Sequence, residues 1–197
     1  AVRQFLEIYD STTNDYIKAQ VNYLAGQSYV TMGVPDQAHA RYQDSIQNYP
    51  LSYDAYLGLV ELIEAGIPVS DLDRGIVDYY ARQYGVALDA LSRYINNNPG
   101  LDGTALHFKA LSLRAMDRSD EAITVWEELI RNYAGDDYWI SAWEQIAVTQ
   151  WSYVGDYEKA AGTYLSFVNL YPAAPQSPGF LFSAARIQEM DNQLEDA

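Results

Sequence analysis

Apolar residues recur along the chain at the spacing of one helix face. In one stretch they stand at i, i+4, i+7 and i+8, namely Ala160, Tyr164, Phe167 and Val168. This spacing favours an amphipathic α-helix. Gly155-Asp156 precedes the pattern and Tyr171-Pro172 follows it, so we predict that the helix begins and ends at these pairs. The small first residue suits a close helix crossing, and the aromatic four residues later fills the space beside it.

The same stripe returns earlier in the chain, each time starting from an alanine. The starting residues are Ala38, Ala87 and Ala122, and Ala1 begins a shorter copy. Before each complete copy lies another apolar stripe at helical spacing, so the helices come in successive pairs. The pattern predicts an all-α protein of about 11 helices.

Five residues of the first pair carry a specific spacing: Gly26, Tyr29, Ala38, Tyr42 and Pro50. This arrangement resembles the consensus of the tetratricopeptide repeat (TPR) family without a gap. The resemblance covers nearly the whole chain and is clearest in the first and fourth repeats. It implies a right-handed superhelix (α-solenoid) of antiparallel helix pairs that binds proteins or peptides.

On this basis we predict one solenoid over residues 1–197. Its parts are a partial repeat (1–14), repeat 1 (15–50), an irregular repeat 2 with an inserted helix (51–99), repeat 3 (100–135), repeat 4 (136–172) and a partial repeat 5 (173–197). Repeat 2 is irregular because Pro50 to Pro99 spans 49 residues, against about 34 for one repeat. Its second helix is placed at Asp71–Gln83, capped by Ser70.

Two further expectations concern the last repeats. The opening helix of repeat 4 is one residue longer than the consensus. Repeat 5 should have an opening helix over Phe180–Met190 and a closing helix that starts at Leu194. Because both chain ends fall inside repeats, we interpret the chain as a segment of a longer protein. The alternative is that atypical terminal repeats act as caps.

Composition narrows the function. The net charge of −15 argues against a nucleic-acid partner, because phosphate binding depends on Lys and Arg. The 49% hydrophobic content is too high for a disordered chain. There is no cysteine, which excludes disulfides and thiolate metal sites. No apolar run has the length of a membrane span, so membrane insertion is not expected.

Candidate chemistry is sparse. The two histidines, His39 and His107, have no second His or Cys at metal-ligand spacing. No metalloprotease, nucleophile-elbow or phosphate-loop motif occurs. Adjacent acids such as Asp136-Asp137 are interpreted as solvated positions, since neighbours in sequence do not converge on one substrate. We therefore predict no catalytic residue, no metal and no cofactor in this segment.

A solenoid offers a groove lined by its opening helices. Projection on the helices gives the following inward-facing candidates: Tyr23, Gln27, Thr31, His107, Leu111, Arg114, Trp151, Phe182 and Arg186. Arginines beside aromatic rings could hold a peptide terminus or a glycan ring by charged hydrogen bonds and stacking. The alternative is that these aromatics only pack between repeats.

The Tyr-Pro repeat ends, the run Phe180–Arg186 and the inserted helix are also similar to bacterial cell-envelope TPR proteins. The nearest likeness is the non-catalytic helical region of soluble lytic transglycosylases; outer-membrane assembly lipoproteins and cell-division coordinators are related alternatives. This resemblance implies an extracytoplasmic location, in the periplasm or cell envelope, without excluding the cytoplasm. Those enzymes carry their catalytic Glu in a Glu-Ser signature, which this chain lacks.

Three functions remain open from the sequence. The first is a protein- or peptide-binding scaffold. The second is the substrate-guiding arm of a peptidoglycan-cleaving enzyme whose catalytic domain lies outside this chain. The third is an architectural spacer.

Overall fold

The computed structural model describes residues 1–100 and 103–195. Over these residues the chain forms 11 α-helices, one π-helical turn and no strand, which confirms the all-α prediction. It divides into two compact units, Ala1–Pro99 (unit 1) and Gly100–Ala197 (unit 2). No described helix is both long and apolar enough to span a bilayer.

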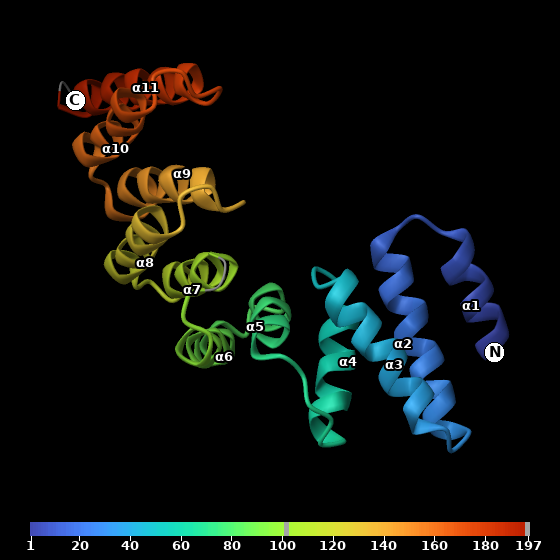
Figure 1. The fold of residues 1–197 in the computed structure, drawn as a ribbon. Helices are drawn as coiled ribbons and strands as arrows, with labels where there is room; N and C mark the ends of the chain where they lie inside the picture. The colour runs from blue at the N-terminus through green and yellow to red at the C-terminus, as the bar shows by residue number, and fades with distance from the viewer. Residues whose placement is uncertain (101–102, 196–197) are drawn as a thin grey trace. The chain divides into compact units, whose positions relative to one another are not determined.

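Unit 1 holds six helices: α1 (Val2–Ser11), α2 (Asp15–Thr31), α3 (Pro35–Asn48), α4 (Tyr53–Glu64), α5 (Asp71–Tyr80) and α6 (Tyr84–Asn97). Unit 2 holds α7 (Thr104–Ala115), α8 (Ser119–Asn132), α9 (Trp139–Thr149), the π turn η1 (Gln150–Val154), α10 (Tyr157–Leu170) and α11 (Ser177–Glu195). Inside each unit, successive helices pack on one another, as in the pairs α2–α3 and α10–α11 (Figure 1). Short turns make such neighbours antiparallel. Residues 51–99 contain three helices, and the division of one continuous solenoid into repeats stays a prediction.

The helix crossings lie where the sequence predicts them. Ala38, Ala87, Ala122 and Ala160 are all 0% exposed. In unit 1, Gly26 of α2 faces the ring of Tyr42 on α3, and a Cβ on Gly26 would lie 2.3 Å from Tyr42 Cε1. Small residues therefore set the close approach of paired helices, and buried aromatics fill the space beside it.

Several helix ends also follow the predicted signals. Pro35 begins α3, where its missing N–H leaves no hydrogen bond unmade. Ser70 Oγ accepts hydrogen bonds from the amides of Leu72 and Asp73 and so caps α5. Gly155 ends the preceding helix at φ +79°, and Asp156 Oδ1 caps α10 by accepting from the Lys159 amide at 3.0 Å.

Helix α5 is shorter than predicted. It ends at Tyr80 rather than Gln83, because Arg82 adopts the left-handed conformation at φ +62°. The amides of Arg82 and Gln83 then donate to the carbonyls of Tyr79 and Asp78. These bonds satisfy carbonyls of the last helical turn, as in common helix C-terminal motifs.

Helix α11 is longer than predicted. It continues to Glu195, so the expected separate closing helix at Leu194 is wrong, and residues 196–197 lie outside the described residues. The stretch from Met190 to Leu194 contains no glycine or proline. Nothing there interrupts the helix, because only residues that break helical hydrogen bonding or favour other backbone conformations would end it.

The extra residue expected in the opening helix of repeat 4 coincides with a change of helix type. Helix α9 passes directly into the π turn η1, which ends at Gly155. A π turn bonds i to i+5 and so takes up an additional residue without ending the helix. Such turns are frequent at functional sites, and Trp151 and Tyr153 both lie on this one.

Each unit has its own hydrophobic core. In unit 1, Tyr42, Ile46, Leu59, Leu62 and Val77 pack together around Ala38. In unit 2, a cluster joins α9, α10 and α11; it consists of Ala147, Ala160, Ala161, Tyr164, Phe167, Phe180, Ala184 and Ile187. Burying each large apolar side chain contributes about 1.5–3 kcal/mol, so these cores hold the helices that carry the surfaces described next.

Candidate functional site

Three of the predicted groove residues lie on α2 of unit 1. Tyr23 is half-buried beside Tyr42, with ring centroids 5.9 Å apart. Gln27 is exposed, and its Nε2 donates to the Tyr23 hydroxyl at 2.9 Å. Thr31 is exposed, and its hydroxyl donates to the Gln27 carbonyl at 3.0 Å. The three side chains form a polar strip along one side of α2.

The other six predicted residues lie in unit 2, where His107 of α7 is a packed residue. It is 6% exposed, and its ring stacks on Tyr138 with centroids 4.3 Å apart. Its Nδ1 accepts a hydrogen bond from Trp126 Nε1 at 3.4 Å. Burial, aided by the nearby charge of Arg114, lowers the pKa of His107 to about 4. The imidazole is therefore neutral at neutral pH and offers a ligand little surface.

Arg114, in the last turn of α7, is held by residues that the sequence did not suggest. Its guanidinium lies 5.1 Å from the ring of Trp126 and 5.0 Å from the ring of Tyr153. Nη1 donates to Gln145 Oε1 at 2.7 Å and to Thr149 Oγ1 at 3.2 Å. Cation–π contacts and charged hydrogen bonds of this kind fix the orientation of an arginine.

The remaining predicted residues differ in exposure. Leu111 is half-buried on α7, and Trp151 is half-buried against the core of unit 2. On α11, Phe182 is 68% exposed, and Arg186 is exposed with its Nη1 2.8 Å from Glu189 Oε2. Of the predicted set in unit 2, His107 and Arg114 are brought together by a shared neighbour, Trp126.

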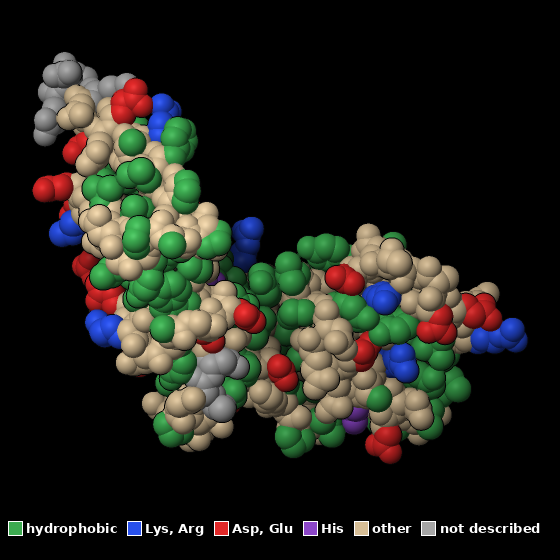
Figure 2. All heavy atoms as spheres, turned by 45° about the horizontal axis from the view of Figure 1, so that its top comes forward, with side chains coloured by type: hydrophobic (Ala, Val, Ile, Leu, Met, Phe, Trp, Pro, Cys, Tyr) green, Lys and Arg blue, Asp and Glu red, His purple; other side chains and the backbone are tan. Residues whose placement is uncertain are grey.

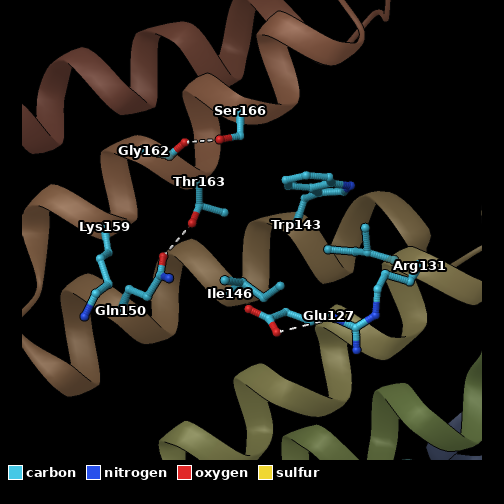
Figure 3. Close-up of a pocket in the computed structure, with 10 residues that line it drawn as sticks. Glu127, Arg131, Trp143, Ile146, Gln150, Lys159, Gly162, Thr163 and Ser166 are labelled. Carbon is cyan, nitrogen blue, oxygen red and sulfur yellow. Dashed lines mark hydrogen bonds and ion pairs between the residues drawn. The ribbon is translucent and has the colours of Figure 1, made fainter.

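A pocket of about 490 Å³ opens between α8, α9 with η1, and α10 (Figure 3). We call it the α8–α10 pocket. It is lined by Glu127, Ile130, Arg131, Trp143, Ile146, Gln150, Lys159, Gly162, Thr163 and Ser166. The lining combines apolar and aromatic groups from α8 and α9 with hydroxyl groups from α10. A few polar groups around apolar surface are typical of ligand pockets.

Two cations line this pocket, and neither is tied strongly to its partner. Arg131 Nη1 lies 3.8 Å from Glu127 Oε2, and Lys159 Nζ lies 2.6 Å from Asp156 Oδ2. Both cationic side chains are well exposed, and ion pairs between exposed groups contribute about 0–1 kcal/mol. A ligand carboxylate could therefore compete for either cation at small cost.

The polar groups on the other side of the pocket are arranged along α10. Thr163 Oγ1 donates to Gln150 Oε1 at 2.7 Å, and Ser166 Oγ donates to the Gly162 carbonyl at 2.8 Å. Trp143 Nε1 is closed off from solvent and has no hydrogen-bond partner in the described part of the chain. The pocket therefore joins an aromatic surface, hydroxyl groups, two cations and the Glu127 carboxylate.

Sequence reasoning missed the α8–α10 pocket, although one signal was present. On α10, the small and polar residues Lys159, Gly162, Thr163 and Ser166 stand at i, i+3, i+4 and i+7. This is a second helix stripe, which runs beside the apolar one. The stripe shows which face of α10 is polar, but it does not show that α8 and α9 leave space in front of it.

On the face drawn in Figure 2, acidic and basic side chains are spread among hydrophobic and neutral groups. Within the described residues, no group of three or more His, Asp or Glu side chains could hold a metal ion. The two cations of the α8–α10 pocket therefore stand out in a chain with 12 basic and 27 acidic residues.

Comparison with known families identifies the helix pairs. Residues 23–66 and residues 109–136 each match a family model described as a tetratricopeptide repeat. The search of curated proteins gave no match. The two matches fall in different units and support a tetratricopeptide repeat protein. Repeats of this kind indicate a scaffold for protein interactions, with proteins as partners.

Proposed function

We propose that the chain is a peptide-binding scaffold module and that the α8–α10 pocket receives a segment of the partner protein. The observation that carries this proposal is the placement of Arg131 and Lys159 beside the apolar groups Trp143 and Ile146 in one 490 Å³ pocket. A segment that joins an apolar side chain to a carboxylate matches this lining. If the apolar side chain of the segment is aromatic, its ring would pack on Trp143 and Ile146. The carboxylate of the segment would accept hydrogen bonds from Arg131 and Lys159.

The test is calorimetric titration with short peptides that pair phenylalanine with glutamate. In the double variant Arg131→Gln/Lys159→Gln we expect affinity to fall at least tenfold, because both donors to the carboxylate are removed. Arg3→Gln is the matched control, since Arg3 forms an exposed pair with Glu7 on α1 of unit 1. Equal affinity of the double variant and the control would rule out this pocket as the site.

The groove predicted from the sequence is a separate proposal for the same function. It places Arg114 and Trp151 in contact with the ligand. Arg114→Ala and Trp151→Ala should then both weaken peptide binding while the variants remain helical by circular dichroism. Unchanged affinity in both variants would refute the groove. That result would not bear on the α8–α10 pocket, which the double variant tests separately.

A finer proposal concerns the protein to which this module belongs. We propose a bacterial cell-envelope protein, and as an alternative function the substrate-guiding arm of a peptidoglycan lytic transglycosylase. Support comes from the sequence resemblance and from the aromatic and cationic lining of the α8–α10 pocket, which suits a sugar ring linked to a carboxylate. Titration with muropeptides decides between the peptide-binding scaffold and the substrate-guiding arm. Binding of muropeptides but not of peptides favours the substrate-guiding arm. Binding of neither would favour the architectural spacer.

A further inference from the structure

Unit 1 contains a second pocket with different chemistry. Its volume is about 270 Å³, and it lies where α4 meets α5 and α6 in the irregular part of the chain. We call it the α4–α6 pocket. It is lined by Tyr56, Leu59, Val60, Ile63, Glu64, Arg74, Asp78, Gln83 and Val86. Most of these side chains are apolar, and three are charged.

Asp78 is the unusual member of this lining. Only 5% of its side chain is exposed, and among the described residues it pairs with Arg74 on the same helix, at 3.5 Å between Arg74 Nε and Asp78 Oδ2. Neither of these atoms has a hydrogen-bond partner in the described structure, and both are closed off from solvent. Burial raises the pKa of Asp78, and the charge of Arg74 opposes that rise.

A carboxylate in this state has unused capacity to accept hydrogen bonds. Taking a charge out of water costs several kcal/mol, which an ion pair offsets only when its geometry is good and the remaining lone pairs are satisfied. At 3.5 Å without a hydrogen bond, the contact with Arg74 does not meet that condition. A donor that enters the pocket would therefore be favoured.

The charges around the pocket favour a cation as that donor. The lining has two acidic side chains, Glu64 and Asp78, and one basic side chain, Arg74. The whole chain carries a net charge of −15, which attracts cations and repels anions at long range. The side chain of Arg74 is 31% exposed, so its guanidinium has solvent into which it can turn when another cation approaches.

The apolar walls specify what carries the cation. Leu59, Val60 and Ile63 of α4 and Val86 of α6 offer aliphatic surface beside the carboxylate. A lysine side chain has four methylene groups that pack on such surface and a compact ammonium group with three donors at its end. Burial of these methylene groups removes apolar surface from water and so favours binding.

We propose that the α4–α6 pocket binds the side chain of a lysine in a segment of a partner protein. The methylene stem packs on α4. The ammonium group takes the place that the Arg74 guanidinium leaves when it turns into solvent, and there it donates to Asp78 Oδ2, which that guanidinium otherwise helps to cover. This site goes beyond the proposed function, because it lies in unit 1 and selects a basic residue, whereas the α8–α10 pocket of unit 2 selects an acidic one.

The test is a ¹H–¹⁵N NMR titration of the full chain with the peptide acetyl-Gly-Lys-Gly-amide. We expect saturable shifts of the backbone amides of α4 and α5. A peptide with norleucine in place of lysine keeps the stem but lacks the ammonium group, and it should bind at least tenfold more weakly. Equal binding of the norleucine peptide, preferential binding of a glutamate peptide, or no binding of the lysine peptide would each overturn the proposal.

Matched variants locate the contact. Asp78→Asn keeps the side-chain shape and removes the charge, so it should weaken the lysine peptide at least tenfold. Asp89→Asn removes the same charge from an exposed position on α6 and should leave binding unchanged. If Asp78→Asn does not fold, Val86→Trp blocks the pocket from a position that is 41% exposed and should abolish the shifts. Wild-type binding in Val86→Trp would contradict the proposal, whatever the outcome for the α8–α10 pocket.

Discussion

At the scale of single residues, the crossing of α2 and α3 depends on the absence of a side chain at Gly26. A Cβ there would lie 2.3 Å from Tyr42 Cε1, and the Tyr42 ring is enclosed by the core of unit 1. We predict that Gly26→Ala lowers the free energy of unfolding by about 1–3 kcal/mol through overpacking. Urea denaturation measures the change.

The control for that variant is Gly85→Ala on α6, because a Cβ on Gly85 meets nothing within 4 Å. Alanine at an unstrained helical position reduces the entropy of the unfolded chain and should stabilise the protein by about 0.4–1 kcal/mol. If both variants had the same effect, the close approach of α2 and α3 would not be limited by Gly26.

His107 provides a prediction about pH. Burial lowers the pKa of His107 to about 4 in the folded chain, against about 6.5 in the unfolded chain. Since the unfolded chain binds the proton first, the stability contributed by neutral His107 is complete above pH 6.5 and is lost as pH falls towards 4. The loss amounts to about 3 kcal/mol.

An NMR titration of the His107 ring protons measures that pKa directly. Denaturation of the wild type and of His107→Gln between pH 6.5 and 4 measures its effect on stability, and the wild type should show the steeper loss. The comparison is needed because burial raises the pKa of Asp78, and that shift favours the folded state as pH falls. A titration near pH 6.5 would contradict the buried environment of His107.

The sequence indicated some of these residues and not others, for a physical reason. Ala38 and Ala160 were found because a crossing residue repeats with the helix period and is read from one helix alone. The contacts of Arg114 with Trp126 and Tyr153 involve three segments of unit 2. Their meeting depends on how the helices rotate against one another, which no local pattern records.

At the scale of helices, the ends of elements determine where side chains point. Gly155 ends η1 at φ +79°, and a Cβ there would meet nothing within 4 Å. A side chain at position 155 would therefore destabilise the fold through backbone strain alone. We predict that Gly155→Ala lowers the free energy of unfolding by about 1–2 kcal/mol, measured by urea denaturation.

Asp117 offers the reverse experiment between α7 and α8. It is exposed and adopts φ +61°, which glycine tolerates without the steric cost. Asp117→Gly should therefore raise the free energy of unfolding. A stabilising Gly155→Ala together with a destabilising Asp117→Gly would show that backbone conformation does not govern these two helix ends.

The elements also show where local signals stop being sufficient. Some helix ends are predicted because the residue type itself favours the conformation found there. This holds for Gly155, Asp156 and Pro35. The end of α5 at Tyr80 depends on Arg82, a residue type with no preference for positive φ. The only sign of the π turn in the sequence is one extra residue in the opening helix of repeat 4. The α8–α10 pocket could not be predicted, because it is the space left between three helices.

At the scale of the whole chain, our two proposals assign opposite preferences to the pockets of the two units. The α4–α6 pocket has a buried carboxylate, and the α8–α10 pocket has two cations. A partner that presents a lysine to one unit and an acidic residue to the other would gain affinity from both contacts, because the second becomes intramolecular. Such a partner would bind the intact chain more tightly than either unit.

The last prediction tests whether the chain is the single solenoid expected from the sequence. Each unit has its own hydrophobic core, so we expect 1–99 and 100–197 each to fold when produced separately. In a solenoid, stability also includes a term from each interface between neighbouring repeats. The intact chain should then unfold in one transition at a higher urea concentration than either part. Its m-value should also exceed the sum of the two parts, since m scales with the surface exposed on unfolding. Two transitions at the midpoints of the separate parts would instead show two independent domains joined at Pro99–Gly100.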